Sequence, residues 1–464
     1  MNDQPMVAAE LPQLNQSPPP HPASLDYLFA NWGTLNRDQR ERLIQQIAEI
    51  DFDRIQTLHR ATDTSAARFE GVERATAPKR LISHDVRRES PAEFQEAREI
   101  GWKALRDGRV GIVLVAGGEG SRLGFPHPKG QFPIGPVSNK SLYQLLTEQA
   151  AAMSRRAGAV IPYYVMTSDA THDETMAFFK VHSYFGYDAS SLHFFRQGKM
   201  PAVDQQTGNV LMSAHDRIAF SPDGHGGLLD AMQTANLFDD LRQRRVDVLF
   251  YHQVDNPLVR VCDPAFIGFH LMHGAEVSTK VVEKEEPDEK VGLLVEVDGR
   301  HQMIEYTDLP SEVAEQRDPT GQLKLRCGNI AVHLFNTDFL DRMARLSLPY
   351  HRSSKSVAFV DEMGQLVQPT ENNAFKFEKF IFDILQHAER PLAMEVVRKH
   401  EFVPLKNSQG TFSPDHVRQA MRRMHTHWMQ RAGWTTEEEL PIEIPPSVAL
   451  DEDDFASNFG LGSR

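Results

Sequence analysis

The stretch GIVLVAGGEGSRLGFPHPKGQF, residues 111–132, decides the fold of this chain. It opens with Gly111–Ala116, a short apolar run bounded by glycines that is too short for a helix and therefore predicts a buried parallel strand. Because glycine has no Cβ, the loop that follows can turn sharply and bring its backbone N–H groups close to an anion or the edge of a base. The glycines of this loop are Gly117, Gly118, Gly120 and Gly124.

Two cations follow the glycines within a few residues. They are Arg122 and Lys129, and Pro126 and Pro128 stiffen the segment that holds Lys129. A glycine turn at the end of a core strand is the structural alternative, but fixed cations beside such a turn have no evident structural task. The combination of strand, glycine loop and cations predicts a polyphosphate site.

The loop matches neither of two common phosphate-binding motifs. A Walker loop requires a glycine, four residues and then Gly-Lys-Ser/Thr, and no such string occurs in the chain. The dinucleotide fingerprint GxGxxG opens directly into a helix, whereas Gly118, Gly120 and Gly124 form GxGxxxG and are followed by prolines. These differences argue against an NAD-dependent oxidoreductase.

Strand and helix patterns alternate after the loop. A helical pattern from Leu142 to Met153, with Ser138 or Asn139 as its expected N-cap, is followed by a buried strand at Ile161–Ser168 and a helix around Glu174. This alternation predicts an α/β fold with a doubly wound, mostly parallel sheet and helices on both faces. The ligand of such a sheet lies beyond the carboxyl ends of its strands.

The composition limits the class of protein. A chain of 464 residues has room for a large core and one or two smaller lobes, and its net charge of −14 argues against nucleic acid or an anionic membrane as the main partner. Its two cysteines allow no disulfide framework and predict a reducing compartment. Because neither a signal-peptide pattern nor a membrane span is recognisable, we expect a soluble, cytoplasmic protein.

The chain is expected to divide into consecutive segments. Leu43, Ile44, Ile47 and Ile50 fall on one face of a helix that starts near Asn36, within an N-terminal helical lobe. The full expectation is a disordered tail at 1–23, this helical lobe at 24–98, a nucleotide- and sugar-binding catalytic domain at 99–390, a small C-terminal lobe at 391–436 and a loosely attached acidic tail at 437–464.

At GGEGSRLG, residues 117–124, followed by PKG, residues 128–130, the chain resembles the UTP-dependent sugar-1-phosphate uridylyltransferases. The form of these motifs is most similar to the UDP-N-acetylglucosamine pyrophosphorylases, and the resemblance covers most of residues 43–428. It implies a nucleotidyltransferase fold of the GT-A-like kind, in which this loop lies over uracil and triphosphate. By the same resemblance Gly117 and Gly118 bind the nucleotide, and Arg122 and Lys129 meet the phosphates of UTP.

The resemblance implies further nucleotide-binding residues in two other strings. In HFFRQGK, residues 193–199, Gln197 follows a short aromatic strand, and its amide both donates and accepts hydrogen bonds, which suits the uracil edge. In SPDGHGG, residues 221–227, a second glycine loop precedes a helix that starts at Leu228, and Gly226 is expected to contact the nucleotide.

The residues expected to contact the sugar also follow from the resemblance. His225 stands where UDP-N-acetylglucosamine enzymes usually carry asparagine, whereas the UDP-glucose and broad-specificity branches carry histidine. Gly292, Glu305 and Asn329 are expected at the sugar hydroxyls or acyl group. A locally bonded turn histidine and a surface glutamate are the structural alternatives for His225 and Glu305.

These last three residues fall in a strand-rich region that begins at Val277. Asp298-Gly299 stands between two alternating runs and is a good hairpin turn. We expect this region to form an antiparallel sheet laid beside the nucleotide domain.

Asp255 comes just past an expected strand at Val246–Tyr251, where a carboxylate can hold Mg²⁺ between the protein and phosphates. The resemblance makes Asp255 the metal ligand and Mg²⁺ the cofactor, although an isolated Asp-Asn pair is also a turn former. Near the end of the chain, the alternating phenylalanines of residues 373–384 fit a strand, but their other spacings favour a helix. Lys376 precedes that helix and is implied at the phosphates, whereas Lys379 is expected to be solvated.

The implied activity joins UTP and a hexose 1-phosphate, preferably N-acetylglucosamine 1-phosphate, into a UDP-sugar and pyrophosphate. UDP-glucose or broad-specificity synthesis is an alternative favoured by His225. A non-catalytic nucleotide sensor on the same fold is another, although such a protein would be expected to lose Lys129, Asp255 or Lys376. The oligomeric state stays open.

Overall fold

The computed structural model describes residues 17–61, 72–361, 363–435 and 441–460. The chain divides into two compact units, and neither is a single stretch of sequence. The first unit comprises residues 1–64, 198–227 and 349–380, and the second comprises residues 65–197, 228–348 and 381–464. This division differs from the consecutive lobes expected from the sequence, because residues 24–98 are shared between the two units.

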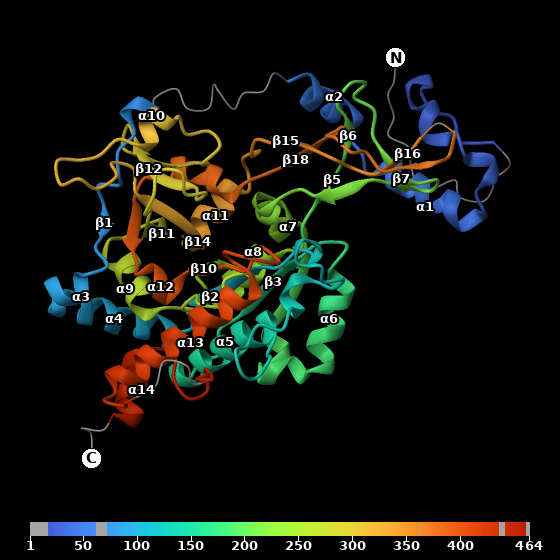
Figure 1. Cartoon of the computed structure of the whole chain (residues 1–464). Coiled ribbons are helices and arrows are strands. Elements are labelled where there is room, and N and C mark those ends of the chain that lie inside the picture. Colours follow the sequence, from blue (N-terminus) through green and yellow to red (C-terminus); the bar gives the residue numbers. More distant parts are fainter. Residues whose placement is uncertain (1–16, 62–71, 362, 436–440, 461–464) are drawn as a thin grey trace. The chain divides into compact units, whose positions relative to one another are not determined.

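The second unit is built on one mixed sheet, which has ten strands among the described residues (Figure 1). Its path runs β1-β19-β11-β14-β10-β2-β3-β4, with β12 and β13 attached at β14. The strands are β1 (Leu81–Ile82), β2 (Val110–Val115), β3 (Tyr163–Thr167), β4 (Leu192–Arg196), β10 (Val248–Gln253), β11 (Val277–Glu283), β12 (Leu293–Val297), β13 (Arg300–Ile304), β14 (Cys327–Asn336) and β19 (Pro391–Glu395).

Four neighbouring strands, β10, β2, β3 and β4, are parallel to one another, as the sequence predicted. β14 is antiparallel to both of its neighbours, β10 and β11. The expectation of a separate antiparallel sheet is therefore wrong, because β14 hydrogen-bonds directly to the parallel strands and continues their sheet. The expected hairpin turn at Asp298-Gly299 is confirmed, since β12 and β13 pair from Val297 and Arg300 outward.

Helices cover both faces of this sheet. Alternate residues of a strand point to opposite faces, and they therefore enter two different hydrophobic cores. Ile112 and Leu114 of β2 join one cluster, and Val113 joins the other. The helices are α3 (Val86–Glu89), α4 (Pro91–Arg106), α5 (Leu142–Ala157), α6 (His172–Val181), α7 (Leu228–Thr234), α8 (Leu237–Arg244), α9 (Pro264–Met272), α10 (Ser311–Ala314), α11 (Thr337–Met343), α12 (Arg398–Glu401), α13 (Pro414–Arg431) and α14 (Glu452–Phe459).

The N-cap expected for α5 is corrected by the structure. The helix is capped by Ser141, whose Oγ accepts a hydrogen bond from the Gln144 backbone N–H at 3.1 Å. Ser138 instead donates its hydroxyl to the carboxylate of Glu443 at 2.6 Å, so the expected cap is used in a tertiary contact. The expected helix around Glu174 is confirmed as α6.

The first unit combines two helices, α1 (Arg37–Ala48) and α2 (Phe52–Arg60), with short strands. Asn36 and Gln39 form a capping box at the start of α1, and Leu43 and Ile47 enter the core of the unit, which confirms the predicted helix. The strands are β5 (Lys199–Pro201), β6 (Val203–Asp204), β7 (Met212–Ala214), β8 (Arg217–Ile218), β9 (Phe220–Pro222), β15 (His351–Lys355), β16 (Phe359–Val360), β17 (Leu366–Val367) and β18 (Ala374–Glu378).

The helix expected within residues 373–384 is wrong. Residues 374–378 form β18, which pairs with β15 and β6, and a 3₁₀ helix, η9 (Ile381–His387), follows in the second unit. Pairing with two strands decides the conformation over the helical spacing. Lys379 is also not solvated, since it is 5 % exposed and its ammonium lies 4.8 Å from the centre of the Tyr350 ring.

The acidic C-terminal segment is well packed over residues 441–460, so the expected loose attachment is wrong there. Phe455 of α14 joins a small core with Trp428 of α13. Asp453 pairs with Arg87 and Asp454 pairs with Arg156, each at 2.7 Å, so the acidic residues have specific partners. The tail expected at 1–23 lies mainly outside the described residues, as do 437–440 and 461–464.

In the part of the chain that the structure describes, none of the helices combines the length and apolarity needed to cross a membrane.

Candidate functional site

The glycine loop lies at the carboxyl end of β2, as predicted. Its two ends are tied together, since the Gly120 N–H donates to the carbonyl of His127 at 3.0 Å and the Lys129 N–H donates to the carbonyl of Gly118 at 3.1 Å. Arg122 lies in the 3₁₀ turn η4 (Ser121–Leu123) and Lys129 begins η5 (Lys129–Gln131). The two predicted cations therefore belong to one closed loop.

Gly117 and Gln197, both predicted to bind the nucleotide, lie together. A Cβ on Gly117 would stand 2.6 Å from the Gln197 Oε1, so any larger residue there would displace this amide from its place beside the loop. Gln197 follows β4 directly, is 8 % exposed and is held by a bond from its N–H to the Thr167 carbonyl at 2.8 Å. A Cβ on Gly118, by contrast, would meet no atom within 4 Å, which leaves open space beside the loop.

Asp255 follows the carboxyl end of β10 and lies between two lysines. Its Oδ2 is 3.7 Å from the Lys129 Nζ and 2.5 Å from the Lys406 Nζ. The sequence placed Lys406 only in a C-terminal lobe, and nothing in its neighbourhood, Leu405-Lys406-Asn407, signals a role in the site. Only the folded chain brings this lysine, far from Asp255 in sequence, to the carboxylate.

The charges of this cluster shift the titration of its members. Burial alone would raise the pKa of Asp255, but the positive charges of Lys406 and Lys129 outweigh it and lower the pKa. The pKa of Lys129 is lowered mainly by burial, and the charges of Lys406 and Arg122 add to that effect against the opposing charge of Asp255. Arg122, Lys129 and Lys406 thus act on one small region that holds an excess of positive charge.

The predicted sugar residues Gly292, Glu305 and Asn329 also lie together. The Asn329 N–H donates to the Gly292 carbonyl at 2.8 Å, and a Cβ on Gly292 would lie 3.3 Å from the Glu305 Oε1. Burial, helped by the charge of Asp308, raises the pKa of Glu305, and the charge of Lys406 opposes the rise. Lys406 therefore acts electrostatically on both Asp255 and Glu305.

His225, Gly226 and Lys376 belong to the first unit and are described within it. The ring of His225 stacks on Phe380, with centroids 5.3 Å apart and an interplanar angle of 11°. The Gly226 N–H donates to the Lys379 carbonyl at 2.8 Å, and a Cβ there would stand 2.6 Å from the Phe380 backbone nitrogen. Lys376 lies on β18 opposite Ser353.

The single carboxylate of Asp255 suits a metal ion that arrives with its substrate, because most of the ion's ligands would then come from phosphates and water. The described residues contain no group of three or more histidine, cysteine, aspartate or glutamate side chains that could hold a metal. Mg²⁺ needs only one or two protein carboxylates when phosphates and water complete its shell. Asp255 offers one such hard oxygen ligand, which fits this mode of binding.

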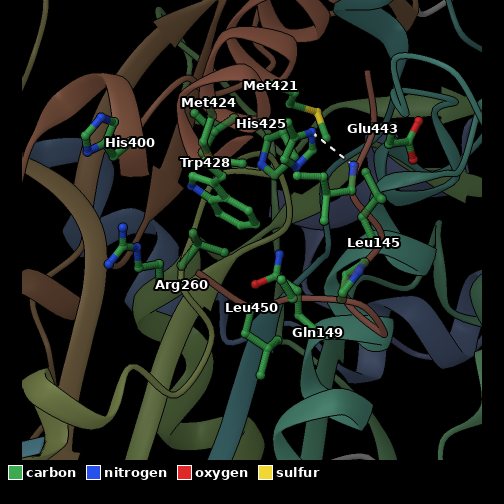
Figure 2. Close-up of a pocket in the computed structure, with 16 residues that line it drawn as sticks. Leu145, Gln149, Arg260, His400, Met421, Met424, His425, Trp428, Glu443 and Leu450 are labelled. Atoms are coloured by element: carbon green, nitrogen blue, oxygen red, sulfur yellow. Dashed lines mark hydrogen bonds between the residues drawn. The ribbon is translucent and has the colours of Figure 1, made fainter. Parts of the chain in front are cut away.

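A small, partly open pocket elsewhere in the second unit has a largely apolar lining. It lies between α13 and residues 443–450, and Figure 2 shows Trp428, Met421 and Met424 among its largely apolar lining. Its volume of about 40 Å³ has room for only a few water molecules. His425 accepts a hydrogen bond from the Ile444 N–H at 3.4 Å, and burial lowers its pKa to about 4. This pocket is a packing feature and not a nucleotide site.

The sheet, the glycine loop and the two lysines that meet Asp255 together define a nucleotidyltransferase. The structure aligns with that of a UDP-N-acetylglucosamine pyrophosphorylase from Trypanosoma brucei in complex with inhibitor, with a TM-score of 0.77 and 27% identity over 93% of this chain and 91% of that one. The chain belongs to the UTP–glucose-1-phosphate uridylyltransferase family, whose model matches residues 72–460. The resemblance and the predicted fold class are both confirmed.

Two relatives match nearly the whole chain. A human UDP-N-acetylhexosamine pyrophosphorylase-like protein 1 is 36% identical over 427 residues, which cover 89% of this chain and 84% of that protein. The UDP-N-acetylglucosamine pyrophosphorylase of Saccharomyces cerevisiae is 34% identical over 448 residues, which cover 92% and 93%.

Proposed function

We propose that this protein transfers the uridylyl group of UTP to a hexose 1-phosphate, preferably N-acetylglucosamine 1-phosphate, and releases pyrophosphate. The observation that carries the proposal is the cluster of Arg122, Lys129 and Lys406 around Asp255 beside a closed glycine loop. A triphosphate supplies the negative charge that this cluster lacks. The names of the relatives support the N-acetylhexosamine substrate.

In the proposed reaction a phosphate oxygen of the sugar 1-phosphate attacks the α-phosphorus of UTP in line, the new P–O bond forms, and pyrophosphate leaves. The nucleophile is already an anion at neutral pH, so no general base is required. The protein contributes positioning and charge neutralisation. We assign Arg122 and Lys129 to the leaving pyrophosphate, and Lys376 and Lys406 to phosphates near the reacting bond.

Mg²⁺ is proposed as the cofactor, with Asp255 as its protein ligand, and when bound it would neutralise charge on the phosphates. Asp255 has a second task that needs no metal. Its carboxylate lies against both Lys129 and Lys406, so it holds two cations in place before substrate binds. Gly117, Gly118, Gln197 and Gly226 are proposed to bind the base and the rest of the nucleotide.

Sugar selection is assigned to Gly292, Glu305, Asn329 and His225. Glu305 suits a pyranose because a carboxylate can accept hydrogen bonds from two hydroxyls. His225 favours the alternative of UDP-glucose or broad-specificity synthesis, whereas the relatives favour the N-acetylated sugar.

The test is pyrophosphate release from UTP and Mg²⁺ with four substrates offered separately: N-acetylglucosamine, N-acetylgalactosamine, glucose and galactose 1-phosphate. We expect an N-acetylhexosamine phosphate to be preferred by about tenfold or more, which corresponds to about 1.4 kcal/mol in the transition state. A preference for glucose 1-phosphate would assign the specificity to His225. Release with none of the four would favour a nucleotide sensor and overturn the proposal.

A further inference from the structure

Residues 401–406 carry Lys406 to the site without the support of a long helix or a strand. α12 ends at Glu401, and the stretch that follows it belongs to no regular element until α13 begins at Pro414. The ammonium of Lys406 nevertheless lies 2.5 Å from the Asp255 carboxylate. Contacts with neighbouring segments must therefore set the register of this stretch against the end of β10.

Asn256 makes two of these contacts, both with the backbone. Its Nδ2 donates to the Glu401 carbonyl at 2.7 Å, and its Oδ1 accepts from the Val403 N–H at 3.3 Å. The same Oδ1 also accepts a hydrogen bond from the Leu258 N–H at 3.3 Å, which fixes the amide within its own segment after β10. One side chain, only 4 % exposed, thus satisfies backbone groups of two segments that are far apart in sequence.

Residues 401–406 are also fixed near both of their ends, before and after the bonds with Asn256. The Leu405 N–H donates to the Asp255 carbonyl at 2.7 Å, one residue before Lys406. At the other end, the Glu401 carboxylate lies 2.5 Å from the Nζ of Lys280, a fully buried lysine. Asn256 therefore bonds a segment whose start is anchored in the core and whose end presents Lys406.

We propose that Asn256 is a positioning residue for the uridylyl transfer, because it sets the register in which Lys406 meets Asp255. This inference rests on the proposed function, in which Lys406 acts on the phosphates. The two neighbouring residues then have different roles. Asp255 pairs with the Lys406 ammonium, and Asn256 holds the backbone of the segment that carries Lys406.

The chain offers a matched control in Asn336. Its Nδ2 donates to the Ala275 carbonyl at 3.0 Å and its Oδ1 bonds the His270 ring at 2.9 Å, so its amide is engaged much as that of Asn256 is. Asn336 pairs with Val248 at the start of β10, whereas Asp255 follows the opposite end of that strand. Asn256→Ala and Asn336→Ala are therefore expected to lower the melting temperature alike.

The experiment measures kcat and KM for both variants, alone and combined with Lys406→Met. We expect Asn256→Ala to reduce kcat about tenfold or more and Asn336→Ala to leave kcat within about twofold of the wild type. In the Lys406→Met background, Asn256→Ala should cost nothing further, because the lysine through which it acts is already gone. A purely structural Asn256 would instead lower activity by the same factor in both backgrounds, which would overturn the inference.

Asn256→Asp keeps the shape and the acceptor bonds while it loses the donor to Glu401, so it serves if the alanine variant does not fold. In the Lys406→Met background, Asn256→Asp is likewise expected to cause no further reduction in kcat. Full activity of either Asn256 variant, with Lys406→Met strongly impaired, would overturn the positioning role alone. Wild-type activity of Lys406→Met would overturn the role of Lys406 and this inference while leaving the proposed uridylyl transfer in place. No pyrophosphate release by the wild-type chain would overturn the proposed function and this inference with it.

Discussion

Two lysine and carboxylate clusters of the second unit differ in charge balance. Around the fully buried Lys280, the ammonium lies 2.7 Å from Asp263 and 2.5 Å from Glu401, and Arg260 lies 3.7 Å from Glu401. Lys129 and Lys406 both pair with the carboxylate of Asp255, and the charge of Arg122 acts on Lys129. The charge of Lys406 also acts on the buried Glu305.

The charge balance of each cluster indicates its role. Two cations and two carboxylates compensate one another around Lys280, so that cluster is complete and fastens segments of the core. The Asp255 cluster keeps an excess of positive charge that only an anion completes, and the Lys406 side chain is 44% exposed. Glu401 belongs to the balanced cluster around Lys280, and Lys406 belongs to the unbalanced cluster around Asp255. Because both residues lie in segment 401–406, the balanced cluster helps to hold Lys406 in place.

The largest effect is expected from breaking the balanced cluster. Lys280→Met would leave Asp263 and Glu401 buried without their main cation, and we expect it to lower the free energy of unfolding by about 3–5 kcal/mol. Chemical denaturation measures the loss. Unchanged stability would mean that the network around Lys280 does not hold the core.

Breaking the unbalanced cluster should instead spare the fold. Lys406→Met is expected to reduce kcat/KM by about 10²–10³, or about 2.7–4 kcal/mol, if the lysine stabilises transition-state charge as an oxyanion donor does. Lys399→Met is the control, because Lys399 is an exposed lysine of the neighbouring α12. Equal activity of the two variants would contradict the assignment of Lys406.

Lowering the pH should destabilise the fold through the buried histidine His270. Burial lowers the pKa of His270 to about 4, whereas in the unfolded chain it titrates near 6.5. The unfolded state therefore binds more protons between these values, so this stabilisation is present above pH 6.5 and is lost as the pH falls toward 4. We expect a loss of about 3 kcal/mol at most from this histidine. Urea unfolding of wild type and His270→Gln at several pH values tests it, and the variant should show the weaker pH dependence.

The smallest effect is expected where the C-terminal segment supports the glycine loop region. The Glu443 carboxylate accepts hydrogen bonds from the Val137 and Ser138 N–H groups, each at 2.8 Å, a few residues after Lys129. Glu443→Gln should raise KM for UTP about two- to fivefold with little change in kcat, since one charge-assisted contact is weakened. Glu452→Gln, whose carboxylate pairs with Arg87 instead, should leave KM unchanged. A similar rise in both variants would mean a general loss of C-terminal packing.

Some expectations failed where a contact from elsewhere in the chain overrode a local pattern. The spacings within residues 373–384 favour a helix, yet residues 374–378 pair with β15 and β6 as a strand. Lys379 was expected in solvent because a lone lysine usually lies there, but it is packed over Tyr350. Ser138 was a plausible helix cap, but its hydroxyl is taken by Glu443.

The strand, the glycine loop, the two cations beside it and the α/β alternation could all be predicted from the sequence, because each depends on neighbouring residues whose spacing has a direct physical meaning. The family could also be recognised from the sequence, since its motifs are short strings such as residues 117–124 and 128–130 that can be read without the fold. Three contacts could be found only in the folded chain: Lys406 meets Asp255, Gln197 packs on Gly117, and Gly292, Glu305 and Asn329 lie together. Such contacts join residues far apart in the chain, and they form only when the sheet orders its strands and the buried polar groups find their partners.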